Sequence, residues 1–136
     1  MARSFFDTNV LFYSFDTTDP NKHKRAKSLI TDLLASGNAV ISIQVIQELA
    51  NNLTKKLGFS NEFVVGICDS LEEFMVVKPD VAMVRRVLNI QTTASVAFWD
   101  ACIVASAERA GCVTLYSEEL NSGQRIGAIK VVNPFA

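Results

Sequence analysis

The chain has 136 residues, with 13 lysines and arginines against 14 aspartates and glutamates, so its formal net charge is −1. Hydrophobic residues make up 49% of the sequence and charged residues 20%, which excludes an intrinsically disordered chain. The near-neutral charge excludes a strongly basic nucleic-acid-binding domain, so any attraction for a nucleic acid must be local. Because no repeat or linker divides the sequence, we expect a single domain over residues 1–136.

Cysteine usage and hydrophobicity indicate the compartment. Cys68, Cys102 and Cys112 form no CxxC pair and lie in runs of apolar or small residues, which predicts packed thiols in a reducing, cytoplasmic protein. The N-terminus lacks the pattern of a signal peptide. The longest apolar stretch, VAFWDACIVASA, is too short to span a bilayer and contains Asp100, so we expect no membrane segment.

Apolar residues spaced for strands alternate along the chain with apolar residues spaced for helices. Strands are expected over residues 3–6, 39–43, 75–77, 113–116 and 130–132. Helices are expected over residues 10–15, 20–36, 44–57, 60–74, 80–91 and 95–110. Asp19-Pro20 and Asp80 are typical of helix starts, while Gly37 and Gly58 are typical of helix ends. This alternation predicts an α/β fold with a central parallel sheet flanked by helices.

Four acidic residues, Asp7, Glu48, Asp100 and Glu119, fall at or within two helical turns of the end of a predicted strand. In open α/β sheets, ligands bind at that rim. Asp100 gives the strongest local signal, because it lies in the second turn of a helix expected to be buried and its helical neighbours are apolar. A lone buried carboxylate is costly, so Asp100 is predicted to be a metal ligand; a structural cap or a distant arginine partner is the alternative.

The other acids are ambiguous by themselves. Asp7 also suits an Asx-type bond to the start of the helix that follows it. Glu48 shares a helix face with amides and Lys55, as a solvated surface glutamate does. Glu118 and Glu119 both follow a predicted strand, and nothing local indicates which of them faces the rim.

The remaining chemistry follows by elimination. His23 is the only histidine and lies in a charged stretch where we expect it in solvent, which excludes histidine-based zinc sites and a Ser-His-Asp triad. The sequence has neither a GxxxxGK[ST] loop nor a GxGxxG turn. Clustered carboxylates require a cation, and hard oxygen ligands favour Mg²⁺ or Mn²⁺. Such ions promote phosphoryl chemistry, so the acids predict hydrolysis of a phosphodiester.

Three segments of the sequence together resemble a known family, although no single acidic residue is specific enough to indicate it. They are SFFDTNVLFYSFD, ISIQVIQELANNLTKK and SVAFWDACIVASAERAGCVTLYSEELNSGQRIGAIKVVNP, in this order along essentially the whole chain. They resemble the PIN domain family, and within it the VapC-type toxin ribonucleases of bacterial toxin–antitoxin modules. The resemblance implies a three-layer sandwich around a parallel sheet, and cleavage of RNA by metal-activated water. It also implies a small cognate antitoxin as partner, and a homodimer.

The resemblance also assigns a Mg²⁺ or Mn²⁺ site and the catalytic role to four acids, Asp7, Glu48, Asp100 and Glu119. The last of them is normally an aspartate, third in a Ser/Thr-x-Asp turn, so Glu119 is a departure. Glutamate reaches about one methylene further, and a displacement near 1 Å costs roughly 100-fold in rate. We therefore expect weakened activity or a metal held through a water. Asn9 and Ser117 match polar positions that are expected to support ligands or waters.

Basic and aromatic side chains indicate less about the substrate. RNA phosphates are expected to contact Lys22, Lys24, Arg25 and Lys27 of one helix, and Lys55 and Lys56 of another. Solvated charges on amphipathic helices are the alternative. Trp99 directly precedes Asp100, and we expect it in the core and not stacked on a base.

Two other functions stay open at this stage. A receiver-like phosphoacceptor domain also places acids at strand ends, but it requires a second acid beside Asp7 and a lysine after the last strand. A catalytically silent, PIN-like partner-binding domain is favoured by the departure at Glu119. Incubation with RNA and a divalent cation separates the silent domain from a nuclease.

Overall fold

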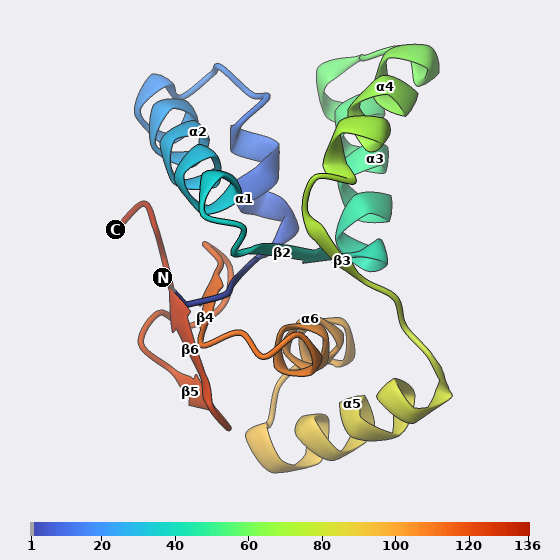
Figure 1. Cartoon of the computed structure of the whole chain (residues 1–136), viewed down its shortest axis with the longest axis vertical. Coiled ribbons are helices and arrows are strands. Elements are labelled where there is room, and N and C mark those ends of the chain that lie inside the picture. The colour runs from blue at the N-terminus through green and yellow to red at the C-terminus, as the bar shows by residue number, and fades with distance from the viewer. Residues whose placement is uncertain (1) are drawn as a thin grey trace.

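The computed structural model describes residues 2–136 and contains a six-stranded sheet with helices on both faces (Figure 1). The strands are β1 (Ser4–Phe6), β2 (Ala39–Ser42), β3 (Met75–Val77), β4 (Thr114–Tyr116), β5 (Arg125–Ile126) and β6 (Ile129–Val132). Their order is β3-β2-β1-β4-β6-β5, and all neighbours are parallel except β5 and β6. The predicted α/β fold with a central parallel sheet is confirmed. The antiparallel β5 is an addition that the sequence did not predict.

The helices form the two outer layers. They are α1 (Thr8–Tyr13), α2 (Pro20–Ala35), α3 (Ile43–Leu57), α4 (Asn61–Leu71), α5 (Val81–Ala94) and α6 (Phe98–Arg109). In Figure 1, α1 to α4 lie on one side of the sheet, while α6 lies on the other side with α5 packed outside it. The arrangement is the expected three-layer sandwich.

Local sequence signals explain most helix boundaries. The carboxylate of Asp19 accepts hydrogen bonds from the backbone N–H groups of Asn21 and Lys22, both at 3.1 Å, which starts α2. The hydroxyl of Ser42, the last residue of β2, accepts from the N–H of Val45 at 3.3 Å, so β2 passes directly into α3. Gly58 ends α3 in the left-handed conformation, with φ at 68°.

One boundary differs in a way that changes the position of Asp100. The last long helix was expected from residue 95, but α6 begins at Phe98. Ser95 has φ at 54° and ends α5 in the left-handed conformation, and Ala97 is extended, so the helix cannot start earlier. Asp100 therefore lies in the first turn of α6, close to an open helix N-terminus, and not in the second turn of a buried helix.

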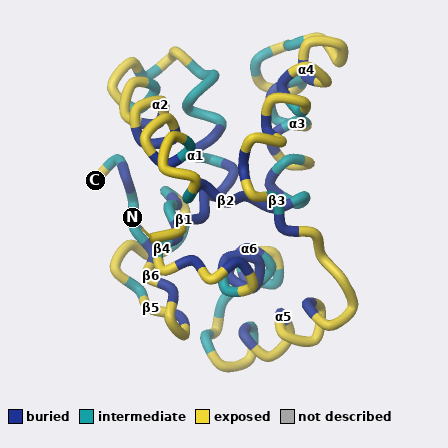
Figure 2. The backbone as a smooth tube through the Cα atoms, viewed as in Figure 1, coloured by how far each residue is buried: buried dark blue, intermediate teal, exposed yellow. Residues whose placement is uncertain are grey.

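The hydrophobic core lies between the sheet and its flanking helices (Figure 2). Phe5 and Phe6 of β1 are fully buried, as is Leu115 of β4. From the helices, Leu53 of α3 and Val104 of α6 are also fully buried. The strand ends are thus fixed by packing beneath them, independently of any side chain at the rim.

Within residues 2–136, no single helix is long and apolar enough to cross a membrane. The helices α5 and α6 satisfy length and composition only as a pair, and they are bent by 114° relative to each other.

Truncation of Leu53 tests the core. Leu53→Ala should lower the free energy of unfolding by about 2–5 kcal/mol, because it removes a fully buried side chain and leaves a cavity. Urea denaturation measures this loss. Lys55→Ala, on the exposed face of the same helix, serves as the control and should change stability by less than about 0.5 kcal/mol. Equal effects of the two substitutions would contradict the packing of α3 on the sheet.

Candidate active site

A cleft of about 430 Å³ opens at the carboxyl end of the central strands. Its walls come from the turn after β1, from α1 and α3, from the start of α6 and from the turn after β4. All four predicted acids line it, each from a different segment: Asp7, Glu48, Asp100 and Glu119. The structure therefore brings together four carboxylates that lie far apart in the sequence, while their catalytic role stays a prediction.

Asp7 is the buried member of this group, with 7% of its surface exposed. Its Oδ1 accepts a hydrogen bond from the backbone N–H of Thr8 at 2.8 Å, which caps α1 as the Asx-type alternative proposed. Its Oδ2 accepts from the hydroxyl of Ser117 at 2.8 Å and from the amide of Asn9 at 3.3 Å. The capping role and the position in the cleft thus belong to the same carboxylate.

The surroundings of Asp7 disfavour its charge. Burial is the largest cause that raises the pKa of this carboxyl, from 3.8 to about 6, against the lowering effect of the hydrogen bonds from Ser117 and Thr8. The negative charges of Glu119 and Glu48 raise the pKa further. Like charges therefore act on one another across the cleft.

Ser117 organises the turn after β4. Its fully buried hydroxyl donates to Asp7 and accepts from the backbone N–H groups of Glu119 and Leu120, both at 3.2 Å. These contacts are compatible with the predicted supporting role of Ser117. Its side chain links the carboxylate of Asp7, after β1, to the backbone N–H of Glu119, after β4. Asn9 makes a parallel connection, because its Oδ1 accepts from the N–H of Glu118 at 3.0 Å.

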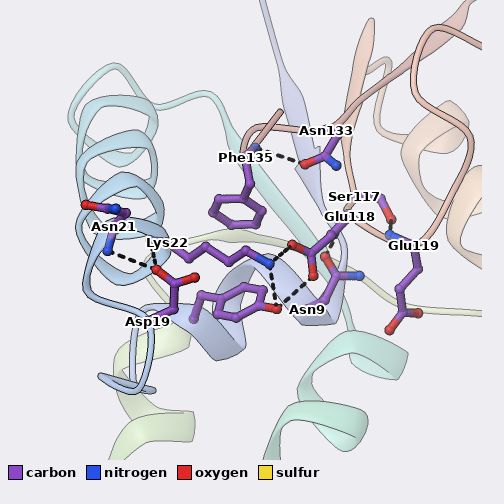
Figure 3. Close-up of polar contacts among 10 residues, drawn as sticks. Asn9, Asp19, Asn21, Lys22, Ser117, Glu118, Glu119, Asn133 and Phe135 are labelled. Carbon is purple, nitrogen blue, oxygen red and sulfur yellow. Dashed lines mark hydrogen bonds and ion pairs between the residues drawn. The ribbon is translucent and has the colours of Figure 1, made fainter.

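The structure distinguishes Glu118 from Glu119, which the sequence left open. Glu118 accepts hydrogen bonds from the hydroxyl of Tyr13 at 2.7 Å and from the ammonium group of Lys22, which is also an ion pair (Figure 3). In Figure 3 the side chain of Glu119 points away from this pair. The charge of Glu118 is thus paired with that of Lys22 in α2, while Glu119 lines the cleft outside this pair.

Glu48 is exposed, as expected of a surface glutamate, yet it faces the cleft. Its Oε1 accepts a hydrogen bond from the hydroxyl of Thr8 at 2.7 Å. Thr8 was not predicted as a site residue, although a hydroxyl beside Asp7 was the available signal. Thr8 contacts both acids, with its N–H on Asp7 and its hydroxyl on Glu48.

Two expectations around the start of α6 were wrong. Asp100 is half-buried and not enclosed in the core, because the first turn of α6 opens onto the cleft. Trp99 is 66% exposed and not a core residue, and its ring packs edge-on against Phe98 with 5.0 Å between centroids. The argument for Asp100 from burial therefore fails, and its place in the cleft is what supports it.

The basic residues are distributed differently from the prediction. Lys22 is paired with Glu118, while Lys24, Arg25, Lys27 and Lys55 are exposed and do not line the cleft. Lys56 does line it. His23 is half-buried and not in free solvent, because its Nδ1 lies 2.8 Å from the carbonyl oxygen of Tyr13.

The donor set of the cleft suits a hard divalent cation. Its acids offer carboxylate oxygens, the ligands that Mg²⁺ and Mn²⁺ prefer, and their mutual repulsion favours a cation among them. As placed, no three acidic, histidine or cysteine side chains in residues 2–136 lie close enough together to enclose an ion. Glu48 and Glu119 are exposed, so enclosure of an ion would require their side chains to move.

The raised pKa of Asp7 predicts that the stability of Asp7→Asn relative to the wild type increases as the pH rises. One pKa unit corresponds to about 1.4 kcal/mol, so the shift from 3.8 to about 6 allows a change of at most about 3 kcal/mol. Because the folded-state pKa lies above the unfolded value, protonation of Asp7 stabilises the wild type as the pH falls from about 7 to about 4.

The stability of Asp7→Asn relative to the wild type should therefore decrease as the pH falls over that range. Urea denaturation of both proteins at several pH values, without divalent ions, measures it. A stability difference that is independent of pH would contradict the raised pKa of Asp7.

Comparisons with known proteins identify the family and the fold of this chain. The sequence model of the family described as PIN domain matches residues 4–120. The fold is similar to that of a toxin–antitoxin complex from Klebsiella pneumoniae, at 20% identity and a TM-score of 0.73, over 96% of this chain and 97% of the other. No curated protein matches this chain closely enough in sequence to count as a relative.

Two further solved structures have the same fold. One is VapC20 from Mycobacterium tuberculosis, described as a sarcin–ricin loop cleaving toxin, at 18% identity and a TM-score of 0.67, over 85% of this chain and 89% of that chain. The other is DNA-bound VapBC from Salmonella typhimurium, at 18% identity and a TM-score of 0.66, over 96% of this chain and 97% of that chain. At these identities the likeness shows the fold, while the match over most of the sequence shows the family: this chain belongs to the PIN domain family.

Proposed function

We propose that this protein is a metal-dependent endoribonuclease, with residues 1–136 forming one PIN-like nuclease domain. The observation that carries the proposal is the meeting of Asp7, Glu48, Asp100 and Glu119 in one cleft, although no two of them share a secondary-structure element. Membership of the PIN domain family agrees with nuclease chemistry. The receiver-like alternative belongs to a different family and is not retained.

Asp7, Glu48, Asp100 and Glu119 are the residues that would hold Mg²⁺ or Mn²⁺. The bound ion would polarise the scissile phosphate and lower the pKa of an attacking water. Three neighbouring residues contact three of these acids. Thr8 donates to Asp7 through its backbone N–H and to Glu48 through its hydroxyl, Ser117 contacts Asp7 and the turn of Glu119, and Asn9 contacts Asp7. Such outer contacts fix the direction of a ligand and are worth roughly 10- to 100-fold in affinity or activity.

Cleavage of RNA tests the proposal directly. The purified protein should cut structured RNA in Mg²⁺ or Mn²⁺, and EDTA or Asp7→Asn should abolish cleavage. Glu119→Gln should lower the rate by at least about 10-fold, because it removes a charge from the metal site. Glu118→Gln is the matched control and should stay near the wild-type rate, since Glu118 is paired with Lys22 and Tyr13 outside the acid group.

The outcomes separate the alternatives. Cleavage that survives EDTA or Asp7→Asn would exclude the metal-nuclease mechanism. No cleavage of any RNA, together with tight binding of a partner protein, would favour the catalytically silent domain that the longer Glu119 suggested. A greater loss in Glu118→Gln than in Glu119→Gln would reverse the assignment of the two glutamates.

We further propose that the protein is the toxin of a toxin–antitoxin pair, acts in the cytoplasm and forms a homodimer. The similar solved structures include toxin–antitoxin complexes, which supports a small antitoxin as partner. The outer face of α5 also supports a protein partner, because Val81, Val84 and Leu88 are exposed there at helical spacing. The free cysteines agree with a reducing compartment.

Expression in bacteria tests the toxin role. Induction of the chain alone should arrest growth, and induction of Asp7→Asn at the same level should not, because the arrest depends on the proposed nuclease site. Optical density and immunoblotting of both cultures measure the effect. Unimpaired growth at high levels of the wild-type protein would count against a toxin, even if the purified protein cuts RNA.

A further inference from the structure

Helix α3 presents a continuous polar stripe to the cleft. Gln44, Glu48, Asn52 and Lys56 follow one another at intervals of four residues, and all four line the cleft. Residues four apart lie on the same face of a helix, one above the other. The stripe therefore runs along the cleft wall from the proposed metal site at Glu48 to Lys56 near the end of α3.

The charge of the cleft makes Lys56 distinctive. Six carboxylates line the cleft: Asp7, Asp16, Glu48, Asp100, Glu118 and Glu119. Among the lining residues within 2–136, Lys56 is the single cationic side chain. A polyanion that enters such a cleft is repelled by the acids and attracted at this one position.

Lys56 is also placed to accept a ligand. Its ammonium group lies 5.5 Å from the centroid of the Phe12 ring, which holds the side chain over the cleft. Among the residues described, the ion pairs found involve Lys22, Arg86 and Arg109, and not Lys56. Lys22, by contrast, is already neutralised by Glu118.

Distance along α3 separates Lys56 from the acid group. The eight residues from Glu48 to Lys56 correspond to about 12 Å along a helix that rises about 1.5 Å per residue. Lys56 is therefore placed to contact a phosphate other than the one at the metal site. Asn52, half-buried and one turn before Lys56, adds an amide that can donate a hydrogen bond to a phosphate or sugar oxygen.

We infer that Lys56, with Asn52, forms a second phosphate subsite, which binds the RNA strand along α3 at a phosphate remote from the bond that is cut. The inference rests on the proposed ribonuclease function and adds to it the path that the RNA strand takes along α3. Lys55 is the matched control, because it is exposed on the same helix turn and does not line the cleft.

Binding of RNA tests the subsite without relying on turnover. Fluorescence anisotropy with a short fluorescein-labelled single-stranded RNA of mixed sequence is measured in the Asp7→Asn background, so that the RNA stays intact. Lys56→Met should weaken binding by about 3- to 10-fold at low salt and reduce the slope of log K against log salt by about 0.7, the value for one phosphate contact on a single strand. Lys55→Met should change neither quantity.

The catalytic readout is independent of the binding readout. In the otherwise wild-type enzyme, Lys56→Met should raise KM and leave kcat nearly unchanged, because a remote contact binds ground state and transition state equally. Equal effects of Lys56→Met and Lys55→Met, or weaker binding without a change in the salt slope, would overturn the subsite while the nuclease function stands. If the wild-type protein neither binds nor cuts RNA, the proposed function and the subsite both fail.

Discussion

The carboxylate of Asp7 is buried at the end of the central strand, and the arrangement of the cleft depends on how it is held there. A buried charge without partners is costly, and Asp7 obtains partners from Thr8 on its own side and from Ser117 across the sheet, both at 2.8 Å. Because the Ser117 hydroxyl also accepts from the N–H groups of Glu119 and Leu120, the turn after β4 is fixed by its contact with Asp7. One interaction thus positions two of the four acids.

Sheet topology explains why the four predicted acids lie in one cleft, although Glu48 and Glu119 were singled out mainly by the resemblance to the PIN domain family. The strands β1 and β4 are parallel neighbours, with Phe6 opposite Tyr116, so the residues that follow them meet although 110 positions separate Asp7 from Ser117. The strand β2, on the other side of β1, passes directly into α3 and brings Glu48 to the same rim. Alternating apolar patterns and capping residues were enough to place these strand ends, and the packing beneath them does the rest.

Local patterns failed where the outcome depends on residues far away in the sequence. Glu118 and Glu119 are chemically identical neighbours, and what separates them is Lys22, which reaches Glu118 from α2, 96 positions earlier. Nothing within the turn contains that information. The error at Asp100 has another cause: small and apolar neighbours suggested burial, while the left-handed Ser95 delays α6 and leaves its first turn open to the cleft.

The same electrostatics connect stability, metal binding and substrate. The acids repel one another, and the effect of Glu48 and Glu119 on the pKa of Asp7 shows this repulsion within the fold. The repulsion among the acids destabilises the fold, so the hydrophobic core beneath the cleft must provide the compensating stability. A divalent cation relieves the repulsion only near the acids. If the protein cuts RNA as proposed, a strand that extends beyond the metal site would meet the remaining negative charge of the cleft, and Lys56, along α3, would offer it a second attraction.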